Sequence, residues 1–220
     1  MSNSGEQRTT AVLLAAGAGT RLGLGPKALL PFQGRPLVEV LADVLLAGGC
    51  REVVTVLGAN AESVRAAANL SQHPVIHNPE WATGMGSSFR AGVAAAAPGD
   101  HVLVALVDQP GLTAETVARL LASHRPGRVT AAAYRGLGGK LERRHPLLLD
   151  SSLRAKAAET ATGDAGARHF LQAHPELIDL IDCSDLSAGE DIDCPEQLHL
   201  LGSTTRSQIQ PRKPHNMGRM

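Results

Sequence analysis

The chain has 220 residues, of which 43% are hydrophobic, and its 21 basic and 21 acidic side chains cancel to a formal net charge of zero. This length and hydrophobic content are enough for one large domain with a buried core. The balanced charge argues against a nucleic acid or a membrane surface held by a broad electrostatic field, so a bound anion must be held locally.

Short apolar runs alternate with amphipathic stretches along the first two-thirds of the chain. Strands are predicted at 10–15, 52–57, 75–77 and 101–107, and helices at 36–47, 61–70, 87–96 and 114–123. The run VLVALV at 102–107 is apolar on both faces, which is typical of parallel strands covered by helices on each side. This β/α alternation predicts a three-layer α/β/α sandwich with a mostly parallel, Rossmann-like sheet.

The last third of the chain is less regular. Strands are predicted at 129–134, 146–149 and 177–182, and helices at 152–159, 165–173 and 194–201. The first two of these strands flank a Gly-rich and then basic connection, RGLGGKLERRH. The polar tail 203–220 has no apolar periodicity and is predicted to be disordered, so we expect residues 8–202 to form a single domain.

Neither the beginning of the chain nor its cysteines indicate a secreted or membrane protein. The first residues, MSNSGEQRTT, have no apolar signal-peptide core. No uncharged apolar run approaches the ~18 residues of a membrane span. Cys50, Cys183 and Cys194 are far apart and show no CxxC spacing, so neither a disulfide framework nor a zinc site is indicated. We therefore expect a soluble cytoplasmic protein with neither membrane nor nucleic-acid partners.

A glycine-rich stretch, LAAGAGTRLGLGPKALLPF at 14–32, follows the first predicted strand. The Rossmann pattern GxGxxG does not fit, because three residues instead of two precede the third glycine. The P-loop pattern does not fit either, because a proline precedes Lys27 and an alanine follows it. Glycines at the carboxyl edge of a sheet allow backbone N–H groups to approach an anion, and Arg21 and Lys27 add positive charge. The stretch therefore predicts a phosphate-binding loop.

The pattern LAAGxGTRxG, followed by a lysine, resembles the first motif of the molybdenum-cofactor type of nucleotidyltransferases. The wider group includes sugar-phosphate and methylerythritol-phosphate nucleotidyltransferases, so the resemblance implies the nucleotide-diphospho-sugar transferase type of fold. The stretch NPEWATGMGSSFRAGV, at 78–93, resembles the second motif, with Ser88 matching a base-contacting serine. The resemblance extends over roughly residues 10–201. The nucleotide-binding residues that it implies are Leu14, Ala15, Ala16, Gly17, Gly19, Thr20, Arg21, Lys27, Gly84, Ser88 and Asp108.

Carboxylates at two places in the chain suit a magnesium ion. Asp108 directly follows a buried strand, in VLVALVDQP, and Mg²⁺ prefers one or two carboxylates together with phosphate oxygens and water. Near the end, GEDIDCPEQL resembles the closing D-I-D-x-P-E-x-L motif of the same group. Asp193 and Glu196 have the spacing of a helix capping box, which predicts a structural role. Asp191 is then expected to be the second ligand, although the choice between Asp191 and Asp193 stays open.

The acceptor side matches the resembled group less closely. GDAGAR at 163–168 looks like its GDxGAR element, which implies that Asp164 and Arg168 lie near the acceptor, unless they only pair with each other. RHPLLL resembles its GHP segment, and His145 is the candidate contact, or else only a satisfied polar residue. Arg144 stands where the group has glycine, which leaves the acceptor open.

Taken together, these motifs predict a magnesium-dependent transfer of CMP from CTP to molybdopterin, with Arg21, Lys27 and Asp108 as the catalytic residues. In the resembled group LAAG accompanies cytidylyl transfer and LAGG guanylyl transfer, and the methyl group of Ala16 narrows the space beside the base. The alternatives are GTP as donor, a sugar or polyol phosphate as acceptor, or a nucleotide sensor that transfers nothing. Transient contact with the enzyme that receives the product is also expected.

Overall fold

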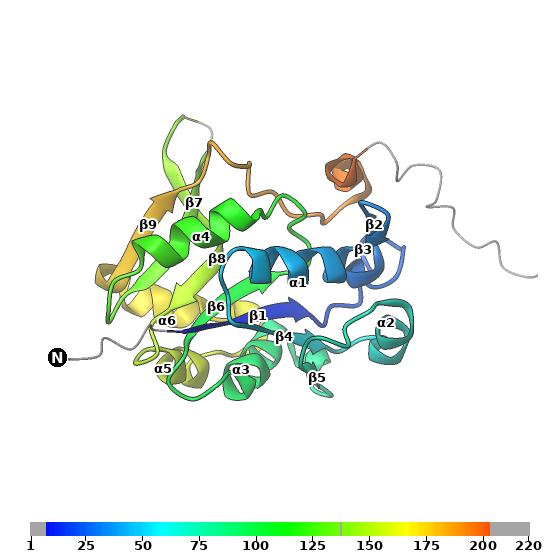
Figure 1. Cartoon of the computed structure of the whole chain (residues 1–220), viewed down its shortest axis with the longest axis horizontal. Coiled ribbons are helices and arrows are strands. Elements are labelled where there is room, and N and C mark those ends of the chain that lie inside the picture. The colour runs from blue at the N-terminus through cyan, green and yellow to red at the C-terminus, as the bar shows by residue number, and fades with distance from the viewer. Residues whose placement is uncertain (1–7, 137, 203–220) are drawn as a thin grey trace, which may run out of the picture.

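The computed structural model describes residues 8–136 and 138–202. Its centre is a seven-stranded sheet with the strand order β5-β4-β1-β6-β8-β7-β9 (Figure 1). The strands are β1 (Thr9–Ala15), β4 (Glu52–Leu57), β5 (Val75–His77), β6 (His101–Leu106), β7 (Val129–Arg135), β8 (Leu141–Leu149) and β9 (Ile178–Asp182). A separate small hairpin joins β2 (Pro31–Phe32) to β3 (Arg35–Pro36).

Most strands of the sheet are parallel, as predicted. β5, β4, β1 and β6 run parallel to one another, and β9 is parallel to β7. β8 is antiparallel to both of its neighbours, β6 and β7. The predicted α/β class with a mostly parallel central sheet is therefore confirmed.

Helices cover both faces of the sheet, because the central strands carry apolar side chains on both of their faces. On β1, Ala11 and Leu13 pack into the cluster beneath α1, whereas Val12 and Leu14 pack toward α3 (Figure 1). The first layer contains α1 (Leu37–Ala47), α2 (Ala61–Ala67) and α4 (Ala114–Ser123). The second contains α3 (Met85–Ala95), α5 (Arg154–Glu159) and α6 (Arg168–Ala173).

Several predicted boundaries differ from the structure, mainly in the last third. β8 begins at Leu141 instead of 146, because its polar first half pairs with β7 as a hairpin. The predicted helix at 165–173 is divided into the 3-10 turn η3 (Gly163–Ala165) and α6, since Gly166 interrupts it with φ of 48°. The helix predicted at 194–201 is the 3-10 helix η5 (Pro195–Leu201). The tail 203–220, which was predicted to be disordered, lies outside the described residues.

Within the ranges that the structure describes, no helix has the length and apolar character needed to cross a lipid bilayer.

The remaining short helices are the 3-10 turns η1 (Lys27–Leu29), η2 (Trp81–Thr83) and η4 (Pro175–Leu177). η1 follows β1 and η2 follows β5, so both lie where parallel strands leave the sheet. β1 and β6 are neighbours in the sheet, so the Gly-rich loop after β1 and Asp108 after β6 lie at the same carboxyl edge.

Candidate active site

The Gly-rich loop after β1 is folded back on itself. Gly19 has φ of 65°, and a Cβ atom placed there would lie 2.0 Å from the carbonyl oxygen of Gly25. Only glycine combines this left-handed backbone with so close an approach. The N–H groups of Leu22 and Gly23 donate to the carbonyls of Gly19 and Thr20, which tightens the turn that carries Arg21.

Lys27 lies between two carboxylates at this edge of the sheet. Its Nζ is 2.9 Å from Asp108 Oδ2 and 2.7 Å from Asp193 Oδ1, and its side chain is only 14% exposed. Arg21 lies 3.7 Å from the same oxygen of Asp193, with its side chain 80% exposed. The structure thus brings Arg21, Lys27 and Asp108 together, and it adds Asp193 to them.

The predicted capping role of Asp193 is wrong. Cys194 is the N-cap of η5, and its capping box uses Gln197 instead of Glu196. Gln197 Oε1 accepts hydrogen bonds from the backbone N–H groups of Asp193 and Cys194. The Asp193 carboxylate is consequently free to turn toward Lys27, a partner 166 positions earlier in the chain that local spacing does not reveal.

The ion pairs between Lys27 and the two carboxylates favour the charged form of each partner. Burial lowers the pKa of Lys27, but the charges of Asp108 and Asp193 outweigh burial, and the net pKa is raised. The hydrogen bond from Lys27 holds the pKa of Asp193 below its ordinary value. Asp191 behaves in the opposite way, because burial and the nearby Asp108 charge raise its pKa.

The carboxylates of Asp108 and Asp191 fit a divalent cation. Asp108 Oδ1 is buried and has no hydrogen-bond partner among the described residues. Asp191 Oδ1 accepts a hydrogen bond of 2.7 Å from Gln109 Nε2, a residue that the sequence interpretation did not assign. An unpartnered carboxylate oxygen beside a second carboxylate of raised pKa is an arrangement that a hard cation relieves.

Two overlapping cavities open at this edge, with volumes of about 630 and 350 Å³. They share the Gly-rich loop, Lys27, Asp108 and Asp164. Of the residues predicted for the site, Ala15 lines neither cavity, because its side chain is in the core beneath α1. The predicted residues that line one or both cavities are Leu14, Ala16, Gly17, Gly19, Thr20, Arg21, Lys27, Gly84, Ser88, Asp108, His145, Asp164, Arg168 and Asp191.

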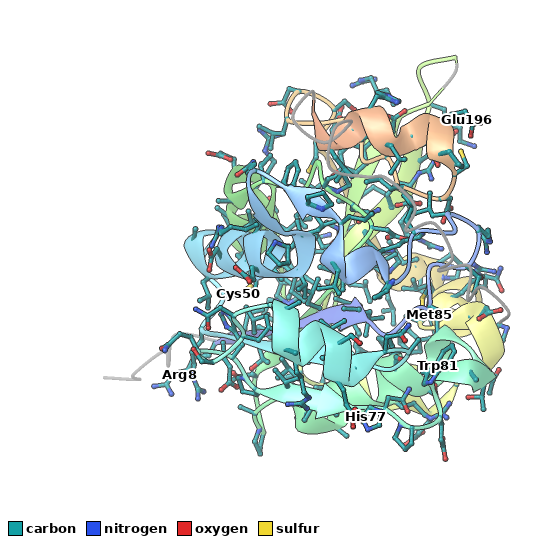
Figure 2. The ribbon with its side chains drawn as sticks, turned by 90° about the vertical axis from the view of Figure 1, so that its right-hand side faces the viewer. Arg8, Cys50, His77, Trp81, Met85 and Glu196 are labelled. Atoms are coloured by element: carbon teal, nitrogen blue, oxygen red, sulfur yellow. The ribbon has the colours of Figure 1, made fainter. Side chains whose placement is uncertain are left out.

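The smaller cavity has a mostly apolar wall. Ala16, Trp81, Met85 and Ser88 line it, and Figure 2 labels Trp81 and Met85 on the side turned toward the viewer. Ser88 is buried, and its Oγ accepts a hydrogen bond of 2.9 Å from Asn78 Nδ2, a partner that the sequence interpretation missed. Trp81 packs against Gly58 and also forms part of this wall.

The larger cavity extends to the acceptor residues suggested by the sequence. His145 and Arg168 line it together with Asp164. Asp164 Oδ1 accepts a weak hydrogen bond of 3.3 Å from the Met85 backbone and makes no ion pair with Arg168 among the described residues. Burial and the charge of Arg143 lower the pKa of His145 to about 4, so its imidazole is neutral at neutral pH.

Comparisons with known proteins identify the family of the chain. Residues 11–177 match the MobA-like NTP transferase domain. Nicotine blue oxidoreductase of Paenarthrobacter nicotinovorans is 59% identical over 194 residues, covering 87% of this chain and 95% of that protein. Bifunctional protein GlmU of Symbiobacterium thermophilum is 32% identical over 116 residues, which cover 52% of this chain and only 25% of GlmU.

Solved structures share the whole fold. A nucleotidyl transferase from Methanothermobacter thermautotroptrophicus is 26% identical with a TM-score of 0.73, covering 86% of this chain and 93% of that one. The Rv0371c protein of Mycobacterium tuberculosis is 25% identical with a TM-score of 0.75, covering 90% and 99% of the two chains. The sequence match over most of the chain and these structural likenesses agree, and the chain belongs to the nucleotidyltransferase family of MobA-like NTP transferase domains.

Proposed function

We propose that this chain is a magnesium-dependent cytidylyltransferase that transfers CMP from CTP to a phosphate-bearing acceptor, with molybdopterin as the first candidate. The observation that carries the proposal is the position of Lys27, which lies between Asp108 and Asp193 beside the Gly-rich loop. In the transfer, an acceptor phosphate oxygen forms a bond to the α-phosphorus of CTP. The bond from that phosphorus to the β-phosphate breaks, and pyrophosphate leaves with its electron pair.

The protein's own residues supply positioning and charge. Arg21, exposed at the cavity mouth, grips the β- and γ-phosphates with its planar guanidinium. Lys27 donates a hydrogen bond to the α-phosphate and stabilises the negative charge that develops there during transfer. Asp108 and Asp191 would hold Mg²⁺, which when bound offsets the repulsion between the triphosphate and the incoming acceptor.

The choice of base rests on the smaller cavity. The Ala16 methyl group on its wall narrows the space beside the base and favours a pyrimidine over a purine. The acceptor would occupy the larger cavity near His145, Asp164 and Arg168. A sugar or polyol phosphate is the alternative acceptor, because Arg144 replaces the glycine of the resembled GHP segment.

Nucleotide competition tests the proposal directly. Labelled CTP or GTP is incubated with Mg²⁺ and a panel of phosphate-bearing acceptors, including molybdopterin, and both pyrophosphate and a new dinucleotide are measured. We expect product from CTP in preference to GTP, with the largest yield on molybdopterin. Tight CTP binding without pyrophosphate release on any acceptor would instead favour a nucleotide sensor.

A redox reaction is the second candidate function, because the 59% identical relative is a nicotine blue oxidoreductase. The substrate would be nicotine blue, reduced by a hydride from a reduced nicotinamide nucleotide, whose pyrophosphate suits the Gly-rich loop, together with one proton from water; the donor leaves as the oxidised nucleotide. Anaerobic bleaching of nicotine blue with stoichiometric oxidation of NADH or NADPH tests it. Bleaching by a sample that releases no pyrophosphate from CTP would replace the first proposal with the second.

A further inference from the structure

Two arginines of the larger cavity have no counter-ion in the part of the chain that the structure describes. Arg143, on β8, and Arg168, at the start of α6, both line the cavity. Neither guanidinium group makes a hydrogen bond or an ion pair with any residue in the described ranges. The cavity's other cations are different, because Lys27 and Arg21 face Asp193, and Arg144 lies 3.4 Å from Glu142.

These two guanidinium groups are close enough to oppose each other. Burial and the positive charge of Arg168 both lower the pKa of Arg143. Like charges placed together in a partly desolvated cavity raise the free energy of the empty site, and a bound anion of two negative charges removes that cost. His145 adds no third charge here, because its imidazole is neutral, and it can still donate one N–H.

The sheet order separates this arginine pair from the triphosphate loop. The loop follows β1, Asp108 follows β6, and Arg143 belongs to β8, the next strand after β6. β1 and β8 are two strand spacings apart, about 10 Å. β8 is paired with β6 as far as Leu147, and both Asp108 and Arg143 line the larger cavity beyond that pairing. Asp108 therefore lies between the loop and the arginine.

We infer that Arg143 and Arg168 bind the phosphate monoester of the acceptor and position its oxygen across Asp108 from the α-phosphorus. This inference rests on the proposed function for the identity of the ligand. The site itself is defined by the arginine pair and takes a dianionic phosphoryl group. Arg143 comes from KLERRH, the segment in which the chain departs from the resembled group, so it also determines acceptor specificity.

Binding of inorganic phosphate, measured by isothermal titration calorimetry, tests the inference apart from catalysis. We expect Arg143→Gln and Arg168→Gln each to weaken phosphate binding by about tenfold or more, the scale of a charge-assisted hydrogen bond. Arg135→Gln is the matched control, because Arg135 belongs to the same hairpin, pairs with Asp182 and does not line the cavity. Its phosphate affinity should equal that of the unmodified chain.

Two further arms identify the source of the phosphate. A nonhydrolysable CTP analogue should leave phosphate binding intact, whereas competition between the two would assign the arginines to the nucleotide and overturn the inference. In transfer assays, Arg143→Gln should raise the KM for the acceptor and leave that for CTP unchanged. Unchanged phosphate affinity in both arginine variants would also overturn it. Arginine-dependent phosphate binding without any transfer would keep the anion site and refute the proposed function alone.

Discussion

Lys27 is held in place before any nucleotide arrives. Asp108 and Asp193 bind its Nζ from two sides, and this half-buried position limits competition from water. The cost of ordering a long, flexible side chain is therefore met in the folded chain, and in the proposed reaction the ammonium group is already oriented when the α-phosphate replaces a carboxylate. A preorganised cation of this kind stabilises charge that develops during transfer more than it stabilises the substrate.

Replacing this lysine tests its contribution to turnover. We expect Lys27→Ala to reduce pyrophosphate release by about 10²-fold or more, the scale lost with one preorganised electrostatic group, while the chain stays folded. Lys140→Ala is the matched control, since Lys140 is exposed in the turn before β8. Pyrophosphate release at saturating CTP and acceptor, together with urea unfolding, provides the measurement. Release from Lys27→Ala at the unmodified rate would contradict the assignment.

Buried histidines at the opposite edge of the sheet make stability sensitive to acid. His101 and His124 have side chains only 3% and 6% exposed, and burial lowers the pKa of each below 6.5, although Asp150 raises it in part. The unfolded chain then binds more protons than the folded chain below that pH. The contribution of each neutral imidazole to stability is therefore complete above its pKa in the unfolded chain. It is lost as the pH falls from that value toward the pKa in the folded chain.

This linkage predicts a decline in the free energy of unfolding below about pH 6.5, by up to about 1.4 kcal/mol per pH unit for each imidazole. For His145, whose folded pKa is about 4, the decline extends over the window from 6.5 to about 4. Urea unfolding at a series of pH values measures it. His124→Asn should flatten the profile, and an unmodified chain with constant stability across this window would refute the prediction.

At the level of the elements, helix α3 lies unusually close to β1 because of one glycine. A Cβ atom at Gly92 would be 2.2 Å from Val12 Cγ1 and 3.1 Å from Val56 Cγ2. The same helix carries Ser88 toward the smaller cavity and meets the 161–163 segment through Gly86. Close packing of α3 on the sheet thus sets the position of the base-side wall.

Gly92→Ala tests this contact by the sign of its effect. In an unhindered helix, glycine to alanine stabilises by about 1 kcal/mol. Here we expect a loss of about 1–3 kcal/mol, because the methyl group overpacks the core between helix and sheet. Gly111→Ala is the control, since its nearest contact would be an ordinary 3.5 Å from Ser187. Stabilisation of Gly92→Ala in urea unfolding would show that the helix can move without cost.

The success of sequence-based prediction also differs from element to element. β1, β4 and β6 were predictable, because strands buried on both faces are mostly apolar along their length. The first half of β8 was not, since LERR has no apolar pattern and becomes a strand only by pairing with β7. Gly166 interrupts the predicted helix at 165–173 near its start through a positive φ, which the letters alone do not reveal.

Across the whole molecule, Lys27 and the carboxylates of Asp191 and Asp193 come from opposite ends of the described chain. The loop after β1 supplies Lys27, whereas the segment before η5 supplies Asp191 and Asp193. Motif resemblance located both segments, but only folding pairs them. That is why Asp193 was assigned to a local cap and its ion pair with Lys27 was missed. The chain has zero net charge, so the positive charge that the proposed phosphate binding needs is placed locally, and this pairing holds it there.

Ile192 fixes the returning segment between its two carboxylates. Its side chain is completely buried in the core beneath α1, and its N–H donates to the Asp108 carbonyl at 2.8 Å. We expect Ile192→Ala to cost about 2–5 kcal/mol in unfolding free energy and Ile192→Val about 0.5–1.5 kcal/mol. Because the alanine variant also loosens Asp191 and Asp193, its turnover should fall even under conditions where the chain remains folded.

Leu120→Ala separates these two effects. Leu120 is equally buried, but it belongs to α4 and packs on β7, away from the cavities. The Leu120→Ala variant should lose a comparable free energy of unfolding and keep its rate of pyrophosphate release per folded molecule. Ile192→Ala should lose both stability and pyrophosphate release. Equal turnover of the two variants, measured where urea unfolding shows each to be fully folded, would mean that the returning segment does not position the site. Lower turnover in Ile192→Ala alone would show that the burial of Ile192 positions Asp191 and Asp193 opposite Lys27.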